Sequence, residues 1–244
     1  MLWILSPAKN MRTCARIAPE TTAPRFLAQA EELWQELHRL APYEIESLMG
    51  VSPALALKTC HDLSAWQPAG GVPAVFSYDG LAYKNLDAAT LTDADLVFAQ
   101  AHLRILSALY GVLRPLDAIW PYRLEMAHKP GGQPLYAFWG DRLANELFQT
   151  GEPVINLASK EYSRAVSAHL PPDAQWISCE FLTYRRGKLR QIATLAKMAR
   201  GQMARYLIRE RIDCPEGLTQ FAWEGFSYEP ALSNSSVFAF VQQN

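Results

Sequence analysis

The chain has 244 residues, of which 50% are hydrophobic and 19% charged, with a formal net charge of −1. This composition is typical of a globular protein with a sizeable core and excludes a disordered or fibrous chain. No stretch approaches the roughly 18 to 20 apolar residues of a membrane helix, and the opening segment MLWILSPAKN lacks the basic lead of a secretory signal. We therefore expect a cytoplasmic protein that has no membrane partner.

In chain order, residues 2–5 are predicted to form a first strand, followed by an irregular loop. Helices are expected over residues 25–40, 43–49 and 53–61, then a strand over 74–78. A long helix is predicted to begin after Thr92, a suitable N-cap, and to end at Gly111, because its apolar residues recur at three- and four-residue steps. The Gly/Pro-rich residues 67–73 are the best candidate for an internal boundary, but we expect one domain over 1–244.

In the second half, helices are expected over residues 136–148, 160–168, where Ser159 is the predicted cap, and 192–212. Strands are expected over 154–157 and 176–182, with a β-hairpin about residues 230–235. Helices and strands alternate irregularly, so the predicted class is α+β, a mixed β-sheet wrapped by helices.

The cysteines and histidines do not follow metal-ligand spacing. Cys14, Cys60, Cys179 and Cys214 are far apart and contain no C-x-x-C pair, which favours reduced thiols over a disulfide framework. The five histidines also lack ligand spacing. We expect no metal site and no cofactor.

Residues 48–56 (LMGVSPALA) separate the two short helices and are similar to the hairpin of a helix-hairpin-helix element, placed here at about residues 43–61. Gly50 permits a tight turn, and free backbone amides at the start of the second helix can bind a phosphate. Ser52 stands where the usual pattern has a second glycine, and Lys58 lies on the second helix. An ordinary corner between two helices is the alternative.

Positive charge is concentrated near the C-terminal third. Residues 185–211 contain nine Lys or Arg and one acid, Glu210, while the rest of the chain has a net charge of −9. On the predicted helix, Lys197, Arg200 and Arg211 share one face, with Arg205 beside them. Such a face binds phosphates without selecting a base sequence, or is simply solvated. Gly201 in mid-helix predicts close approach by another backbone or by a ligand.

Residues 103–126 place Arg104, Arg114, Arg123, Asp117 and Glu125 among aromatic residues and prolines. Charges in such surroundings must be paired, because an unpaired buried charge is costly. A structural ion-pair network and a polar cleft for a nucleotide or base both account for this run.

Six segments together resemble the YaaA family, a bacterial family linked to the peroxide stress response. They are SPAK (6–9), LYGVLRPLD (109–117), PYRLEM (121–126), FWGD (138–141), INLAS (155–159) followed by Glu161 and Tyr162, and KMARGQMARY (197–206). The resemblance implies a cytosolic protein that limits damage by free iron during hydrogen peroxide stress. It also implies binding of double-stranded DNA through a basic cleft and a helix-hairpin-helix element, on an unusual mixed fold.

The favoured function is DNA binding without strong sequence specificity, through the phosphate backbone and without an obligate protein partner. The residues predicted to contact DNA are Gly50, Ser52, Lys58, Lys197, Arg200 and Arg205. The alternative is an enzyme that acts on a nucleobase or nucleotide, since base chemistry needs a positioned acid or base. Its candidate cleft consists of Lys9, Tyr83, Arg114, Tyr122, Arg123, Glu125 and Ser159. Motifs of serine hydrolases, P-loop NTPases, dinucleotide-binding proteins and zinc proteases do not occur.

Overall fold

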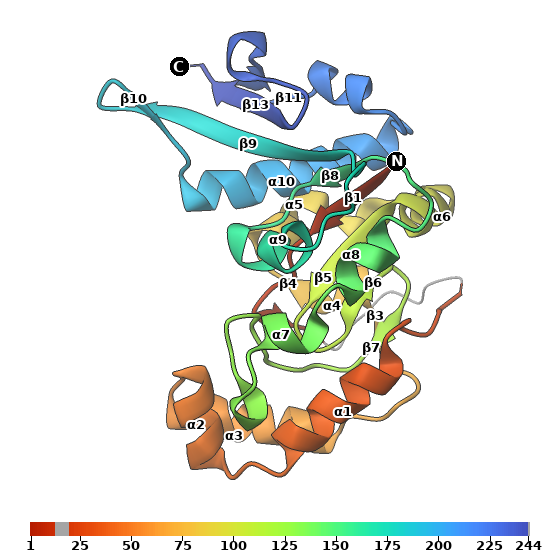
Figure 1. The fold of residues 1–244 in the computed structure, drawn as a ribbon, viewed down its shortest axis with the longest axis vertical. Helices are drawn as coiled ribbons and strands as arrows, with labels where there is room; N and C mark the ends of the chain where they lie inside the picture. Colours follow the sequence, from red (N-terminus) through yellow and green to blue (C-terminus); the bar gives the residue numbers. More distant parts are fainter. Residues whose placement is uncertain (13–19, 244) are drawn as a thin grey trace.

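The computed structural model describes residues 1–12 and 20–243, so Cys14 lies outside the described residues. A mixed sheet with the strand order β11-β12-β13-β9-β8-β1-β5-β6 forms the centre, and β10 pairs with β9 off this path (Figure 1). These strands are β1 Leu2–Leu5, β5 Leu103–Ser107, β6 Gly111–Leu113, β8 Val154–Asn156, β9 Trp176–Arg185, β10 Lys188–Arg190, β11 Ala222–Trp223, β12 Phe226–Tyr228 and β13 Val237–Gln242. The predicted α+β class with a mixed sheet is confirmed.

Parallel pairing dominates the middle of this sheet. β1 is parallel to β5 on one side and to β8 on the other, and β8, β9 and β13 continue in parallel. β6, β10 and β12 pair antiparallel with their neighbours. Two small antiparallel pairs complete the strands, β2 Asn10–Met11 with β4 Tyr78–Asp79, and β3 Val72–Pro73 with β7 Ala118–Ile119. β1 and β8 are buried along their whole length, as expected of parallel strands covered on both faces.

The helices are α1 Leu27–His38, α2 Pro42–Met49, α3 Pro53–Ser64, α4 Ala74–Ser77, α5 Leu81–Leu86, α6 Asp93–His102, α7 Leu135–Trp139, α8 Arg142–Leu147, α9 Lys160–Ser167 and α10 Ala193–Arg209. Short 3₁₀ turns occur at Ala88–Thr90, Pro130–Gly132, Pro215–Gln220 and Pro230–Leu232. α10 packs on β9 and α5, and α6 packs on β1 and β5. α1, α2 and α3 lie together at one end of the long axis, and α10 lies toward the other (Figure 1). None of the helices within the described ranges is both long and apolar enough to cross a bilayer.

The three helices predicted in the N-terminal part are confirmed as α1, α2 and α3. Pro42 and Pro53 each occupy a first-turn position, where a missing N–H costs nothing. Gly50 ends α2 in the left-handed conformation with φ +59°, and Ser52 caps α3 by accepting from the Leu55 amide. The turn thus has the expected geometry, while its role as a helix-hairpin-helix element stays a prediction.

The long helix predicted from Thr92 to Gly111 is wrong in its second half. Thr92 does cap α6 in a capping box with Asp95, but the helix ends at His102. Residues 103–107 form β5 because this apolar run pairs in parallel with the buried β1. An apolar run of this kind fits a buried strand as well as a helix face, so the tertiary pairing decides.

Two further element predictions differ from the structure. Residues 74–77 form the short helix α4 rather than a strand, because the Ala74 and Val75 amides bond to the carbonyls of Asp117 and Pro115. The helix predicted over 136–148 is divided into α7 and α8 at Gly140, whose φ of +51° and ψ of −131° are not helical. The hairpin predicted about residues 230–235 is confirmed as the connection between β12 and β13.

Candidate functional site

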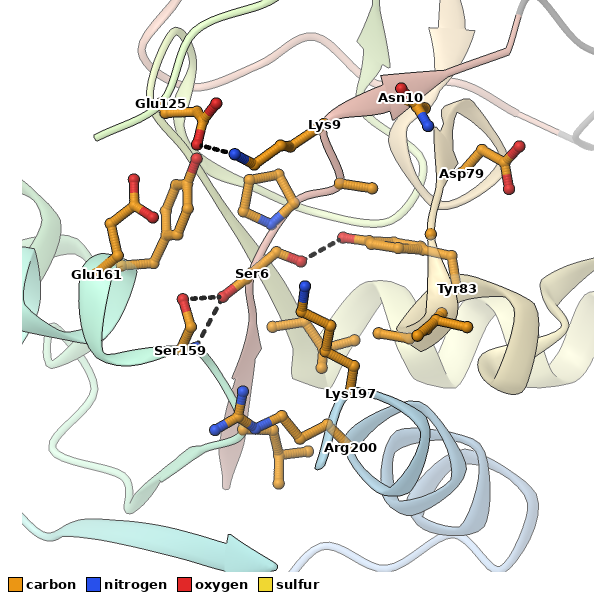
Figure 2. A pocket seen from close by; sticks show the side chains of 18 of the residues that line it. Ser6, Lys9, Asn10, Asp79, Tyr83, Glu125, Ser159, Glu161, Lys197 and Arg200 are labelled. Carbon is orange, nitrogen blue, oxygen red and sulfur yellow. Dashed lines mark hydrogen bonds and ion pairs between the residues drawn. The ribbon is translucent and has the colours of Figure 1, made fainter. Parts of the chain in front are cut away.

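A pocket of about 310 Å³ opens at the carboxyl ends of β1 and β8. These two strands are parallel neighbours in the sheet. The next strand of the central sheet along the chain after β1 is β5, which lies on one side of the pair, and the next after β8 is β9, which lies on the other side. Connections that leave adjacent parallel strands in opposite directions open a crevice, where α/β sheets commonly bind ligands. The segments that follow the two strands, residues 6–10 and 157–162, line this crevice (Figure 2).

A serine pair ties the two strand ends together. The Ser6 hydroxyl donates to Ser159 Oγ at 3.1 Å and accepts from the Ser159 amide at 2.8 Å. The Tyr83 hydroxyl donates to the Ser6 carbonyl at 2.9 Å. Ser159 is the N-cap residue of α9, as predicted, but its side chain makes no capping hydrogen bond because it is engaged with Ser6. The pocket floor is therefore fixed by bonds between segments distant in sequence.

An ion-pair cluster forms another wall of the pocket. Lys9 Nζ lies 2.6 Å from Glu125 Oε2, and Arg123 Nη2 lies 3.8 Å from Glu125 Oε1. Arg123 also donates to the Lys9 carbonyl at 3.4 Å. The Glu125 amide donates to Nδ1 of His128, whose pKa is lowered by burial. Glu125 therefore holds both neighbouring cations, and its removal would leave them without this counter-charge.

The tyrosines beside the pocket are neutral hydrogen-bonding groups. The Tyr122 hydroxyl lies 2.8 Å from that of Tyr78 and 2.7 Å from that of Ser107. Burial raises the pKa of Tyr122 to about 12 and the pKa values of Tyr78 and Tyr83 well above their usual value. At neutral pH these phenols serve as uncharged donors and acceptors, and they cannot balance the cations of the pocket.

Six of the seven predicted cleft residues converge on this pocket: Lys9, Tyr83, Tyr122, Arg123, Glu125 and Ser159. Arg114 lies outside its lining, bound through Nε and Nη2 to Asp117 at 3.2 and 3.0 Å. Asp117 is completely buried and also accepts from the Thr22 hydroxyl and the Arg114 amide. The charged run over residues 103–126 thus contains both a structural ion pair and part of a cleft. Catalysis by the cleft residues stays a prediction.

The cations of α10 have different surroundings. Lys197 and Arg200 line the pocket, whereas Arg205 donates to the carbonyls of Leu86 and Asp87 at the end of α5. Arg211 forms an ion pair with Asp95 at 2.8 Å and packs over the Phe98 ring. The predicted helical face is wrong at its end, because α10 stops at Arg209 and Arg211 lies beyond it with φ +55°. The helix therefore carries two pocket cations on that face, and DNA contact by Lys197, Arg200 and Arg205 stays a prediction.

At the other end of the molecule, the predicted DNA contacts Gly50, Ser52 and Lys58 lie on and beside the turn between α2 and α3 (Figure 1). Gly50 and Ser52 are exposed, and space for a side chain is open at Gly50. Lys58 is paired with Asp62 at 2.5 Å on α3. The turn offers an accessible helix start, but it lies far along the molecule from α10.

A basic hairpin was missed by the sequence analysis, which ended the strand at residue 182. β9 continues to Arg185, and the two residues Arg186 and Gly187 turn the chain into β10 with φ values of +52° and +74°. Positive φ at both positions is what a two-residue hairpin turn of type I′ requires. The signal was present as Arg-Gly between alternating residues. Arg185, Arg186, Lys188 and Arg190 are all exposed.

Potential metal ligands are not grouped in the part of the chain that the structure describes: no three His, Cys, Asp or Glu residues lie close enough to hold an ion. Cys60, Cys179 and Cys214 are free thiols, as expected for the three described cysteines.

Comparison with known proteins gives a consistent result over the whole chain. The family model of the peroxide stress protein YaaA matches residues 1–232. A UPF0246 protein of Leptothrix cholodnii is 42% identical over 254 aligned residues that cover 98% of each chain. A UPF0246 protein of Teredinibacter turnerae is 39% identical over the full length of both chains, and one of Burkholderia vietnamiensis is 40% identical over 98% of each.

Proposed function

This chain belongs to the family of the peroxide stress protein YaaA, and we propose that it acts in that response by binding the phosphate backbone of DNA in the cytoplasm. Binding is without strong sequence specificity, because phosphate contacts position a protein on DNA but carry no base information. It limits the damage that unincorporated iron causes to DNA when peroxide is present.

The observation that carries this proposal is the charge arrangement on the β9–β10 hairpin. Arg185 and Lys188 are directly opposed across the two strands, although like charges at such positions are destabilising. Arg186 and Arg190 add two further exposed cations, and no ion pair of these four residues with a carboxylate is found among the described residues. The hairpin projects beyond the rest of the sheet (Figure 1). An anionic partner would relieve the repulsion that the free protein retains.

The turn between α2 and α3 supports a second contact. Pro53 has no N–H and the Leu55 amide donates to Ser52, so the Ala54 amide is the donor that the first turn of α3 offers to a phosphate. This turn and the hairpin lie toward opposite ends of the long axis (Figure 1). A DNA duplex that contacts both places would use several phosphates, because a contact confined to one base pair would not reach both.

The link to iron follows from the counterions of DNA. Iron(II) associates with phosphate oxygens, and its reaction with peroxide there produces hydroxyl radicals beside the strand. A protein that neutralises phosphates with Lys and Arg releases the condensed cations. Bound protein would therefore remove iron from the sites where the radicals do most harm.

The test compares two variants that each lose three exposed cations. One replaces Arg185, Arg186 and Lys188 with Gln, and the control replaces Arg39, Lys129 and Lys160 with Gln. We expect binding of unrelated duplexes by the wild type, falling steeply with salt. The slope of log affinity against log salt should drop by about 2 to 3 in the hairpin variant only, at about 0.9 per lost phosphate contact.

A matched strand-break assay with iron(II) and peroxide tests the iron link. The wild type and the control should protect a plasmid, and the hairpin variant should not. An equal salt slope in both variants would refute the hairpin as the contact, and absence of binding at low salt would refute DNA binding altogether. Protection that persists in a variant unable to bind DNA would refute the displacement of iron.

A further inference from the structure

The guanidinium of Arg200 has no counter-charge among the residues that the structure describes. Its Nε atom is buried without a hydrogen-bond partner, and no ion pair of Arg200 is found within the described residues. Asp95, Asp117 and Glu125 are each matched by a cation. Cys179 stays neutral because burial raises its pKa, so it does not balance this charge. Arg200 is half-buried and lines the pocket, so an anion that enters the pocket can supply the missing counter-charge.

Lys197, one turn away on α10, adds a second charge for which the described part of the chain supplies no ion pair. Its ammonium group and the Arg200 guanidinium extend from the helix toward Ser6 and Ser159 (Figure 2). The carboxylates of the pocket are committed elsewhere: Asp79 lies 2.6 Å from Arg12, and Glu125 lies 2.6 Å from Lys9. The side chain of Glu161 accepts from the Ala127 amide and points away from the two cations in Figure 2.

The position of these cations is fixed by backbone packing. A Cβ atom at Gly201 would lie 2.0 Å from the Ala82 carbonyl oxygen, so α10 and α5 are in backbone contact beside the pocket. Ala82 and Tyr83 belong to the lining. The two cations are therefore held over a preformed cavity by a close contact between the two helices.

The other residues that line the pocket indicate the chemistry of the rest of the ligand. Leu5, Pro7, Leu81 and Leu157 provide apolar surface, and Tyr83 provides a neutral ring. A volume of about 310 Å³ is at the small end of ligand pockets, which span roughly 300 to 1,000 Å³. Two positive charges match a phosphomonoester, which carries about 1.5 to 2 negative charges at neutral pH, better than they match a carboxylate.

We propose that this pocket binds a small phosphomonoester, with its phosphate between Arg200, Lys197 and Ser159 and its apolar or ring portion against Leu5 and Leu157. A phosphomonoester has two sources here, a free metabolite or the terminal phosphate of a DNA strand. The size of the pocket favours the free compound. This site is separate from the basic hairpin and does not depend on the proposed DNA contact.

The first experiment follows the melting temperature of the protein in phosphate-free buffer with increasing adenosine 5′-monophosphate, inorganic phosphate or adenosine. We expect the two phosphates to stabilise the protein and adenosine to have no effect, because only the anion completes the pair. Arg200→Met should need at least about ten times more phosphate for the same rise in melting temperature, because it loses a charge-assisted contact. Arg209→Met, an exposed residue of the same helix outside the pocket, should change nothing.

A second readout needs no ligand. Without phosphate, Arg200→Met should melt at the same temperature as the wild type or higher, because the substitution removes an unpaired charge. A lower melting temperature, an equal phosphate response in Arg200→Met, or no response to either phosphate would overturn the proposal. Stabilisation by a 5′-phosphorylated oligonucleotide, but not by free adenosine 5′-monophosphate or by the 5′-hydroxyl strand, would overturn the assignment to a small molecule.

Discussion

Replacement of Gly201 by Ala tests whether the contact between α10 and α5 holds the pocket together. On an isolated helix this change would stabilise by close to 1 kcal/mol, because Ala is the better helix former. In the protein, the new Cβ would meet three backbone atoms of Ala82, at 2.0, 2.8 and 3.0 Å. Backbone atoms cannot turn aside as a flexible side chain can.

The magnitude follows from the separation that the clash requires. Because Cβ contacts under 3.0 Å essentially do not occur, the two helices must move apart by at least about 1 Å. Overpacking of this kind costs about 1 to 3 kcal/mol, and the rigidity of both helices places it at the upper end. After the gain in helix propensity, we expect a net loss of about 2 kcal/mol, or about 4 to 8 °C in melting temperature.

The assay is urea unfolding and a thermal melt of Gly201→Ala beside Thr194→Ala, an exposed position in the first turn of the same helix. Thr194→Ala should be neutral or slightly stabilising, since it improves helix propensity without meeting another segment. The phosphate response should also weaken in Gly201→Ala, because Ala82 lines the pocket. A melting temperature equal to or above that of the wild type would refute the role assigned to this glycine.

Two further predictions concern buried polar groups. Asp117→Ala should lower the free energy of unfolding in urea by about 3 kcal/mol, which is the lower end for a broken buried ion pair, because the Arg114 side chain is 39% exposed and can be hydrated. The control is Asp173→Ala, at an exposed position. Equal effects of the two substitutions would contradict this account. Tyr122 has its pKa raised to about 12, so its contribution to folding is complete below pH 10 and is lost as pH rises from about 10 to 12. That loss is roughly 2 to 3 kcal/mol for two pKa units, measured by unfolding at pH 9 and 11.5. Equal tyrosinate absorbance of the folded and the urea-unfolded protein at pH 10.5 would show that this residue titrates like an exposed one.

Local patterns in the sequence were sufficient for several elements. Pro42 and Pro53 at helix starts and Gly50 between them define α2 and α3 without help from the rest of the chain. Thr92 and Asp95 form the predicted start of α6 for the same reason. Gly201 also predicted a close backbone approach, and the Ala82 carbonyl supplies it. Capping and backbone conformation involve residues within one turn, so a single sequence contains them.

The candidate site could be predicted in its residue types but not in its shape. Lys9, Glu125 and Ser159 were grouped from charge, loop position and family resemblance, and the structure brings all three to one pocket. The sequence did not predict which carboxylate each arginine binds. Arg114 and Arg123 belong to one charged run, yet Asp117 binds the first and Glu125 the second. Which carboxylate lies within reach depends on the path of the loop.

Only the tertiary structure decided which surfaces pack against each other. Residues 103–107 suit a helix face and a buried strand equally, and pairing with β1 makes them a strand. Helical periodicity predicted Lys197, Arg200 and Arg211 on one face, but α10 ends at Arg209, and periodicity carries no information on what covers each of these cations. Asp95, more than a hundred residues away in the chain, neutralises Arg211, while the Nε atom of Arg200 is buried without a partner among the described residues. The cost of a charge depends on its distant neighbours and on the water that they exclude, and these exist only in the folded chain.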